Sequence, residues 1–374
     1  MKLHRRWSVW CWLALVALLS SCAAQRSVYV GASDNKLYAL SGLDGSLRWQ
    51  QTLGGAVHTT PFHWAGNIIV AAADGVVYAF DADSGKPLWQ RTLVSAGQAA
   101  GMAAQSVLST PVMPINGRLY IGTGLGDVFE VGADAGATVL KAQLGVAGRQ
   151  WLASSLDGAT VFVSSAGGSV AALGTASGAL LWQQRLPAPV GPPAPAPNGG
   201  LAVPGIAGLS LLDAAHGGAL VTTYTAVGLV EGVAVDPTSG LSYVLDSTGK
   251  VQQLALAVPP GYSPVWTAMP TSAAGYAPFY STAFTPSIPL FVSFVDGTVA
   301  SLTPNSGGVN WRQHVDVDLA GAPHYASVGA ADTYAVLVVS TTGHVYALDP
   351  ANGSTLWKQV SVIGGSVDAS VGAP

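Results

Sequence analysis

The chain has 374 residues, of which 49% are apolar and only 9% are charged. Soluble domains average about 25% charged residues, so this composition excludes a disordered polyelectrolyte and a charged coiled coil. Glycine and proline together number 69, which suits many short strands joined by tight turns. Outside the first six positions the chain carries 12 basic and 19 acidic residues. The basic residues are scattered singly, which excludes nucleic acid as a partner because its phosphates need a clustered basic face.

The first 22 residues form a predicted export signal. Three basic residues lie in the first six positions, followed by ten apolar residues at 10–19, a run too short to span a bilayer. A charged start, a short apolar core and a small-residue ending are typical of a secretory signal. The ending, Leu19-Ser20-Ser21-Cys22, resembles a bacterial lipobox. That resemblance implies that Cys22 is lipidated after cleavage; the alternative is an ordinary signal peptide whose cysteine has no role.

This interpretation divides the chain into a lipoprotein signal peptide at 1–21, a lipidated linker at 22–26 and a folded domain at 27–374. The other cysteine, Cys11, lies inside the signal. No thiol then remains for a disulfide, a metal site or a nucleophile. In such lipoproteins an aspartate directly after the lipidated cysteine signals retention at the inner membrane. Here the residue is Ala23, so we expect a lipid-anchored protein of the outer membrane that faces the periplasm.

Beyond residue 27 a repeat of about 44 residues runs through the chain, and such a period indicates a repeat architecture. Two copies are nearly identical: one runs from Asp74 to Trp89 and the other from Thr342 to Trp357. Eight copies fill the folded domain, and their final positions are 39 to 51 residues apart. Leu140 and Val221 occupy that position in two copies, where we expect weaker contacts. The other six copies end in Trp49, Trp89, Trp182, Trp266, Trp311 and Trp357.

Each copy predicts a small antiparallel sheet. Apolar runs such as 77–80 suit a strand that is covered on both faces. The aspartate and glycine that follow suit a hairpin turn, because the carboxylate can cap N–H groups and glycine can take positive φ. A four-stranded sheet cannot bury both faces alone, but several sheets packed radially can. The tryptophan, a side chain that buries about 150–250 Å², would then wedge between neighbouring sheets.

The pattern Gly-x-Val-Tyr-Ala-Leu-Asp-x-x-x-Gly-x-x-x-Trp resembles the tryptophan-docking repeat of the quinoprotein-type (PQQ-like) β-propellers over residues 27–374. The resemblance implies an all-β fold, an eight-bladed propeller of four-stranded antiparallel blades. The folded domain begins on a second-strand pattern at 27–31. It ends on 365–371, which matches the first-strand pattern at 56–61. We therefore predict that the N-terminal and C-terminal strands pair and close the propeller.

Three connections exceed the repeat, at 94–105, 187–197 and 257–282. The second holds six prolines, and proline cannot donate to a strand ladder, so this segment is expected to be a loop or a stiff edge. The third is rich in aromatic residues, which are enriched at the cores of interfaces. The alternative is that these rings pack under their own loop. The residues that we expect to bind a partner are Tyr262, Tyr276, Phe279 and Tyr280.

The enzymes of the quinoprotein family hold pyrroloquinoline quinone (PQQ) over a calcium ion. Such a site needs several basic side chains for the quinone carboxylates, oxygen ligands for calcium and an aspartate base. After the signal the chain has only two glutamates, and most aspartates hold turn positions in the repeat. We therefore favour a non-catalytic protein without cofactor or metal. The alternative is PQQ with calcium, for which Arg149 and Trp151 form the pair to inspect.

The histidines do not form a metal-binding pattern. His58 and His63 are close in sequence, but His58 aligns with ordinary first-strand positions and no third ligand lies nearby. Structural or surface roles are expected for them. The same holds for His216, His314, His324 and His344, each of which stands alone in a turn or strand.

A lipidated, exported propeller without a catalytic set most resembles the lipoprotein propellers of the outer-membrane β-barrel assembly machinery. That resemblance implies a scaffold for protein–protein interaction in the assembly and insertion of outer-membrane β-barrel proteins. Its blade edges and loops would contact protein partners in the cell envelope, such as the barrel-inserting subunit of that machinery, and its membrane contact would be the lipid anchor only. Two alternatives stay open: a PQQ-dependent dehydrogenase, and a periplasmic propeller that binds a sugar or a peptide.

Overall fold

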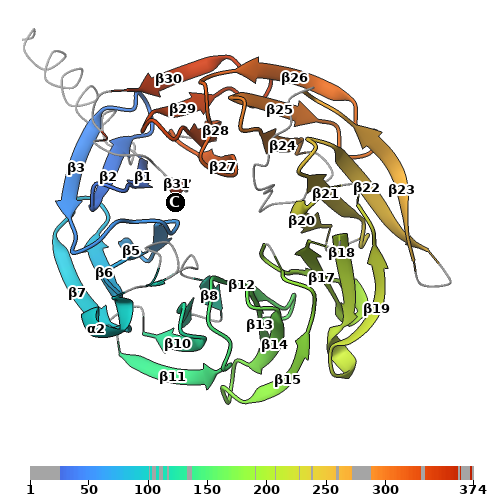
Figure 1. The fold of residues 1–374 in the computed structure, drawn as a ribbon. Coiled ribbons are helices and arrows are strands. Elements are labelled where there is room, and N and C mark those ends of the chain that lie inside the picture. The colour runs from blue at the N-terminus through green and yellow to red at the C-terminus, as the bar shows by residue number, and fades with distance from the viewer. Residues whose placement is uncertain are drawn as a thin grey trace, which may run out of the picture.

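The computed structural model describes residues 26–372 with several gaps. The gaps are residues 101, 103–106, 109–112, 116–117, 133–136, 190, 207, 227, 237–238, 258–260, 272–287, 330–332, 361–362 and 364–370. Eight small antiparallel sheets stand radially around a central axis (Figure 1). The prediction of an all-β, eight-bladed propeller is therefore confirmed.

Within each blade the chain runs from the centre of the propeller to its circumference, each strand pairing with the next. Blade 1 holds the strands from both ends of the described chain. Blades 1 to 4 consist of β31 (Val371–Gly372), β1 (Ser27–Gly31), β2 (Lys36–Ser41) and β3 (Leu47–Thr52); β4 (Phe62–Trp64), β5 (Asn67–Ala71), β6 (Val76–Asp81) and β7 (Pro87–Thr92); β8 (Met113–Ile115), β9 (Arg118–Gly122), β10 (Asp127–Val131) and β11 (Thr138–Gln143); and β12 (Gln150–Ser154), β13 (Thr160–Ser165), β14 (Ser169–Gly174) and β15 (Leu180–Arg185).

Blade 7 has three described strands, and blades 5, 6 and 8 have four each. Blades 5 to 8 consist of β16 (Ala194–Ala196), β17 (Gly200–Gly205), β18 (Gly208–Asp213) and β19 (Ala219–Tyr224); β20 (Val230–Val235), β21 (Ser242–Asp246), β22 (Val251–Ala257) and β23 (Gly261–Ala268); β24 (Leu290–Ser293), β25 (Thr298–Leu302) and β26 (Val309–His314); and β27 (His324–Ser327), β28 (Tyr334–Val339), β29 (Val345–Leu348) and β30 (Thr355–Gln359).

The two ends of the described chain close the propeller in blade 1. Strand β31 pairs antiparallel with β1, with Val371 opposite Val30 and Gly372 opposite Tyr29. This confirms the predicted pairing of the terminal strands. Closure matters because it fixes the first and last repeats in one sheet and so removes the free ends of the repeat array.

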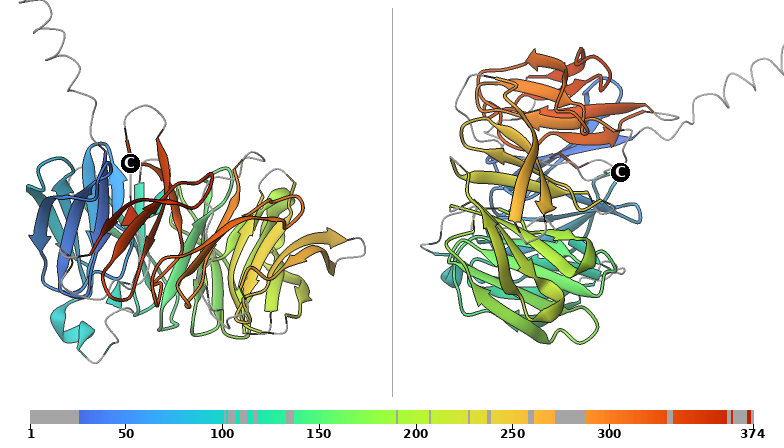
Figure 2. Two further views of the ribbon diagram at one scale, coloured as in Figure 1. Left: turned by 90° about the horizontal axis from the view of Figure 1, so that it is seen from above. Right: turned by 90° about the vertical axis from the view of Figure 1, so that its right-hand side faces the viewer.

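Two of the three long connections contain short regular elements. The first holds helix α2 (Ala96–Ala99), whose N-terminus is capped by reciprocal hydrogen bonds between Ser95 and Gln98. The proline-rich second connection includes β16, the innermost strand of blade 5, where Pro195 pairs with Leu201 of β17. At the start of the third connection, β22 and β23 form a hairpin that projects past the circumference (Figure 2).

The core lies between the blades, where strands such as β1, β2, β5 and β14 are buried on both faces. In β1, Val28 and Val30 pack against residues of blade 8 that include Leu337, whereas Tyr29 packs against residues of blade 2 that include Ile68. This two-sided burial explains why the inner strands are almost continuously apolar. Among the described residues there is no helix of the length and apolar character that crossing a membrane would require.

Candidate functional site

Tryptophans on five of the outer strands bond to the turn of the next blade. The indole N–H of Trp357 in blade 8 donates to the backbone oxygen of Gly42 in blade 1 at 2.7 Å, and Trp49 of blade 1 donates to Ala82 of blade 2 at 3.0 Å. The 8-to-1 contact is therefore of the same kind as the others and joins the last repeat to the first. The remaining bonds of this kind are Trp182 to Ala214, Trp266 to Pro304 and Trp311 to Pro350, over 2.8–3.0 Å.

The glycine that precedes each tryptophan in the sequence is explained by the contact with the neighbouring blade. A β-carbon on Gly45 would lie 2.6 Å from the ring of Trp357, and one on Gly85 would lie 2.6 Å from the ring of Trp49. Both glycines have φ of 71°, a conformation that other residues rarely adopt. The turn of each blade is therefore shaped to receive the tryptophan of the blade before it.

A glutamine two residues after the tryptophan adds a second bond to the same turn. Gln51 donates to the backbone oxygen of Gly85 at 2.8 Å, and Gln359 donates to that of Gly45 at 2.9 Å. Gln184 makes the equivalent bond at 3.0 Å. Sequence reasoning missed these residues, although the Trp-x-Gln pattern repeats at 49–51, 182–184, 311–313 and 357–359.

For Trp89, the sixth tryptophan of the repeat, the structure describes an apolar contact. It is partly buried against a cluster that includes Ile69 of blade 2 and Leu119 of blade 3. The turn of blade 3 at 133–136 lies outside the described residues.

In blade 5 the structure moves the tryptophan position by one residue. Thr222, rather than Val221, lies opposite Leu211 in the register that holds tryptophan elsewhere. Gly218, rather than Gly217, has the ring of the preceding tryptophan against it. The reason is the turn, which contains the 3₁₀ element η2 (Ala214–His216) and is one residue longer than its counterpart in blade 2.

In blade 3 a lysine stem makes the contact with the next blade, and ion pairs within blade 3 hold that lysine in place. The side chain of Lys141 lies over Gly178 of blade 4, and its ammonium pairs with Glu130 at 2.8 Å, while Arg118 pairs with the same carboxylate at 2.7 Å. Burial opposes the ionisation of Glu130, but the bonds from Lys141 and Arg118 outweigh it and lower its pKa. The stem of Lys141, the residue after Leu140, thus covers the turn glycine of blade 4.

Tyrosines on the third strands are fixed by carboxylates. Tyr38 donates to Asp34, and Tyr78 donates to Asp74, in each case across a turn of four residues. Burial, together with the bond to Asp74, raises the pKa of Tyr78 to about 12. The repeat aspartate therefore holds a tyrosine of its own blade as well as its turn.

Blade 8 reaches the same arrangement with a different carboxylate. Thr342 stands where the repeat aspartate would be, and Asp316 from the preceding connection accepts hydrogen bonds from Tyr346 at 2.9 Å and from the backbone N–H of Val317 at 2.8 Å. Its Oδ2 also lies 2.7 Å from Nδ1 of His344. Burial opposes ionisation of Asp316, but these bonds outweigh it and hold its pKa well below the usual range.

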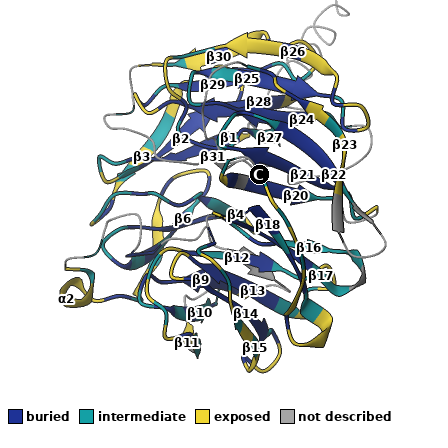
Figure 3. Ribbon diagram, turned by 45° about the vertical axis from the view of Figure 1, so that its right-hand side comes forward, coloured by how far each residue is buried: buried dark blue, intermediate teal, exposed yellow. Residues whose placement is uncertain are grey.

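The outer strands carry exposed aliphatic side chains, which we call the outer belt. Figure 3 colours the exposed positions yellow, for example along the outer strand β26. Every outer strand contributes at least one, at or near the bulge that precedes the tryptophan position. The outer strands are also the last strands of their sheets, and such edges offer unpaired backbone groups to another chain. The outer belt consists of Leu47, Leu88, Val139, Leu180, Leu181, Leu220, Val221, Val265, Val309 and Leu356.

The residues predicted to bind a partner lie only in part within the described chain. Tyr262 is on β23, the outer strand of the projecting hairpin, and pairs through its backbone with Leu256. Tyr276, Phe279 and Tyr280 lie outside the described residues.

The two residues named for the quinone alternative lie against each other. The guanidinium of Arg149 lies 5.6 Å from the centroid of the Trp151 ring, which is a cation–π contact at the start of the innermost strand of blade 4. In the part of the chain that the structure describes, no three His, Cys, Asp or Glu side chains converge as metal ligands. His58 and His63 therefore have no third ligand there, and burial lowers the pKa of His63.

The family model described as outer membrane protein assembly factor BamB matches residues 7–150, 134–257 and 295–368. The chain belongs to this family. No individually curated protein matches the sequence significantly.

Among solved structures, BamB from Moraxella catarrhalis is 17% identical, with a TM-score of 0.59 over 88% of this chain and 89% of that one. AztD from Citrobacter koseri is 12% identical, with a TM-score of 0.62 over 94% and 98%. Sqt1 from Saccharomyces cerevisiae is 13% identical, with a TM-score of 0.65 over 85% and 91%. At these identities the likeness shows the propeller fold.

The tryptophan that joins blade 8 to blade 1 provides a test of the blade contacts. We predict that Trp357→Ala lowers the free energy of unfolding by about 3–5 kcal/mol, because it removes a large buried ring and leaves a cavity. Leu356→Ala is the matched control, since Leu356 is 46% exposed and should cost less than about 1 kcal/mol. Urea unfolding of both variants gives the comparison. Equal losses would show that the indole contact does not stabilise closure.

The hydrogen bonds that Asp316 accepts from Tyr346 and Val317 predict that the free energy of unfolding depends on pH. The folded pKa of Asp316 lies below its unfolded value, so its contribution is present at neutral pH and is lost as the pH falls below about 4. Asp316→Asn should therefore cost about 1–3 kcal/mol at pH 7 and progressively less at pH 4 and pH 3. Urea unfolding across these pH values measures the difference. A difference that stays constant with pH would contradict an ionised Asp316 as its source.

Proposed function

We propose that this protein is a non-catalytic, lipid-anchored scaffold of the outer membrane that takes part in the assembly and insertion of outer-membrane β-barrel proteins. The observation that carries the proposal is the match of the BamB family model over most of the chain. The structure of BamB from Moraxella catarrhalis covers 88% of this chain, which supports the same reading.

The proposed anchor is Cys22, at the end of a signal peptide at 1–21 and followed by a linker at 22–26. Residues 1–25 lie outside the described chain, and the lipobox resemblance supports their role. With Ala23 after the cysteine, the domain at 27–374 would face the periplasm from the outer membrane.

The proposed partner is the barrel-inserting subunit of the assembly machinery. Two features of the described residues support a protein partner: the exposed outer belt and the free edges of the outer strands, such as β23. An edge strand can pair with an extended segment of another protein, and exposed aliphatic side chains give that pairing an apolar contact. Tyr262, Tyr276, Phe279 and Tyr280 remain candidates for the same surface.

The anchor is tested by fractionation of cell envelopes. We predict that Cys22→Ala abolishes acylation and releases the protein from the outer-membrane fraction. Ala23→Asp should keep the protein acylated but shift it to the inner-membrane fraction, and Ala24→Asp is the control that should leave it in place. Metabolic labelling with palmitate and immunoblotting of separated membranes measure both properties. Outer-membrane recovery of unlabelled Cys22→Ala would refute the anchor.

The role is tested by purification of the native lipoprotein from mildly solubilised envelopes, followed by mass spectrometry. We expect the barrel-inserting subunit to copurify in near-stoichiometric amount. A clean protein without partners would refute the scaffold role, and titration with quinone and with glycans would then separate the dehydrogenase from the sugar-binding alternative.

A further inference from the structure

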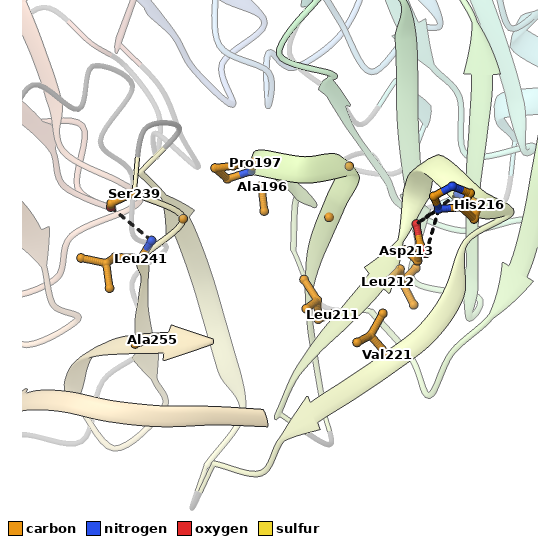
Figure 4. A pocket seen from close by; sticks show the side chains of 13 residues that line it. Ala196, Pro197, Leu211, Leu212, Asp213, His216, Val221, Ser239, Leu241 and Ala255 are labelled. Carbon is orange, nitrogen blue, oxygen red and sulfur yellow. Dashed lines mark hydrogen bonds and ion pairs between the residues drawn. The ribbon is translucent and has the colours of Figure 1, made fainter. Parts of the chain in front are cut away.

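A cavity of about 460 Å³ opens between blades 5 and 6 (Figure 4). Leu211 and Val221 line it from blade 5, and Leu241 and Ala255 line it from blade 6. Its volume falls in the range of small-molecule and side-chain binding pockets.

The strand register of blade 5 explains why the contact between blades 5 and 6 is open. The residue opposite Leu211 on β19 is Thr222, in the position held by tryptophan in six other blades. The residue opposite Leu211 on β17 is Ala202. At the position of Ala202, four blades that have the tryptophan hold a second ring in contact with it. These ring pairs are Tyr29 with Trp49, Phe162 with Trp182, Tyr243 with Trp266 and Phe291 with Trp311, with centroids 5.8–6.2 Å apart.

Blade 5 has therefore lost both aromatic side chains of one contact. Leu211 is larger than the Ala172 that holds the same position in blade 4, but one leucine does not replace two rings. The blades still meet nearer the axis, where Leu209 of blade 5 packs with Val230 and Leu254 of blade 6. The cavity thus lies where a tryptophan would dock, in an otherwise closed interface.

The surroundings of the cavity restrict what can enter it. Its wall is aliphatic, and Ser239 places a hydroxyl at the blade 6 side. Asp213 lies at the blade 5 side, where its carboxylate accepts a hydrogen bond from the backbone N–H of His216 and lies 3.1 Å from Nδ1 of the same residue. Its side chain is still 37% exposed, and no lysine or arginine is among the described residues of the lining. Val221 belongs both to the cavity wall and to the outer belt, and the outer strands of the two blades, β19 and β23, also carry Leu220 and Val265 of that belt. An incoming protein segment would therefore meet apolar surface on its way to the cavity.

We propose that this cavity is a docking slot for a tryptophan side chain of a protein partner, on a segment with a lysine or arginine next to the tryptophan. The indole would occupy the volume that the propeller fills with its own tryptophan between other blades, and the basic residue would face Asp213. The slot deepens the proposed scaffold role and rests on it, because it names the chemistry by which a partner is held.

The first test fills the slot from within the chain. Thr222→Trp should raise the Tm by about 5 °C, because it restores the missing ring at its own register position. Thr223→Trp is the matched control: it adds the same ring one residue away, on the other face of β19 and exposed in the wild type, and should leave the Tm within about 1 °C. A Tm for Thr222→Trp at or below that of the control would overturn the slot.

The second test probes the empty slot directly. N-acetyl-tryptophanamide is titrated into the purified full chain while the methyl resonances of Leu211, Val221 and Leu241 are followed by NMR. We expect saturable shifts with a dissociation constant on the order of 1 mM, at least tenfold weaker binding of N-acetyl-leucinamide, and loss of the shifts in Thr222→Trp but not in Thr223→Trp. Absence of shifts in the wild type, or shifts that persist in Thr222→Trp, would overturn the inference.

The third test separates the slot from the scaffold role. The native lipoprotein and both variants are purified from envelopes, and the barrel-inserting subunit that copurifies is quantified. Loss of the subunit from Thr222→Trp alone, by tenfold or more, supports the slot. Equal recovery with all three proteins overturns the slot and leaves the scaffold role standing. Recovery with none refutes the scaffold role, and the tryptophanamide shifts then decide the slot by themselves.

Discussion

The structure depends on one repeated interaction, the seating of an outer-strand tryptophan on the turn of the next blade. A four-stranded blade has two apolar faces and cannot bury either one alone. The indole ring covers the turn glycine while its N–H satisfies a turn carbonyl, and the Trp-x-Gln glutamine adds a second bond. Because Trp357 makes this contact with the turn of blade 1, the same interaction that stacks the repeats also closes them. Strand β31 then completes the sheet that holds the first repeat.

A repeated contact tolerates local replacement, and the replacements are informative. In blade 3 the stem and charge of Lys141 take the place of the ring, with Glu130 as the buried counter-charge. In blade 8 the carboxylate for Tyr346 comes from Asp316 after the repeat aspartate became Thr342. In blade 5 nothing of similar size replaces the ring, and a cavity results. The first two replacements supply a side chain in place of the usual one, whereas the third leaves a space at the contact with blade 6.

The fold supports a binding role more directly than a catalytic one. The residues that recur from blade to blade have structural roles: aspartates hold the turns and tyrosines of their own blade, and glutamines hold the turns of the next blade. What remains on the surface is the outer belt and the strand edges. Membership of the BamB family gives this surface a proposed context in the envelope, while propellers of 12–17% identity show how widely the same fold occurs.

The sequence by itself determined the blade number, the strands, the closing pair and the tryptophan pattern, because each of these is encoded locally in a repeat of apolar runs and turn residues. It also indicated the export signal and Cys22. Only the tertiary structure decided that Thr222 rather than Val221 holds the tryptophan register, that Lys141 covers Gly178, and that a cavity lined by Leu211 and Leu241 opens between blades 5 and 6. Turn length and bulge position can shift a strand by one residue without changing its apolar pattern. The space between two blades depends on side chains that are twenty or more residues apart in the sequence. A one-residue shift changes which side chain meets the next blade, so the local pattern could not reveal the slot.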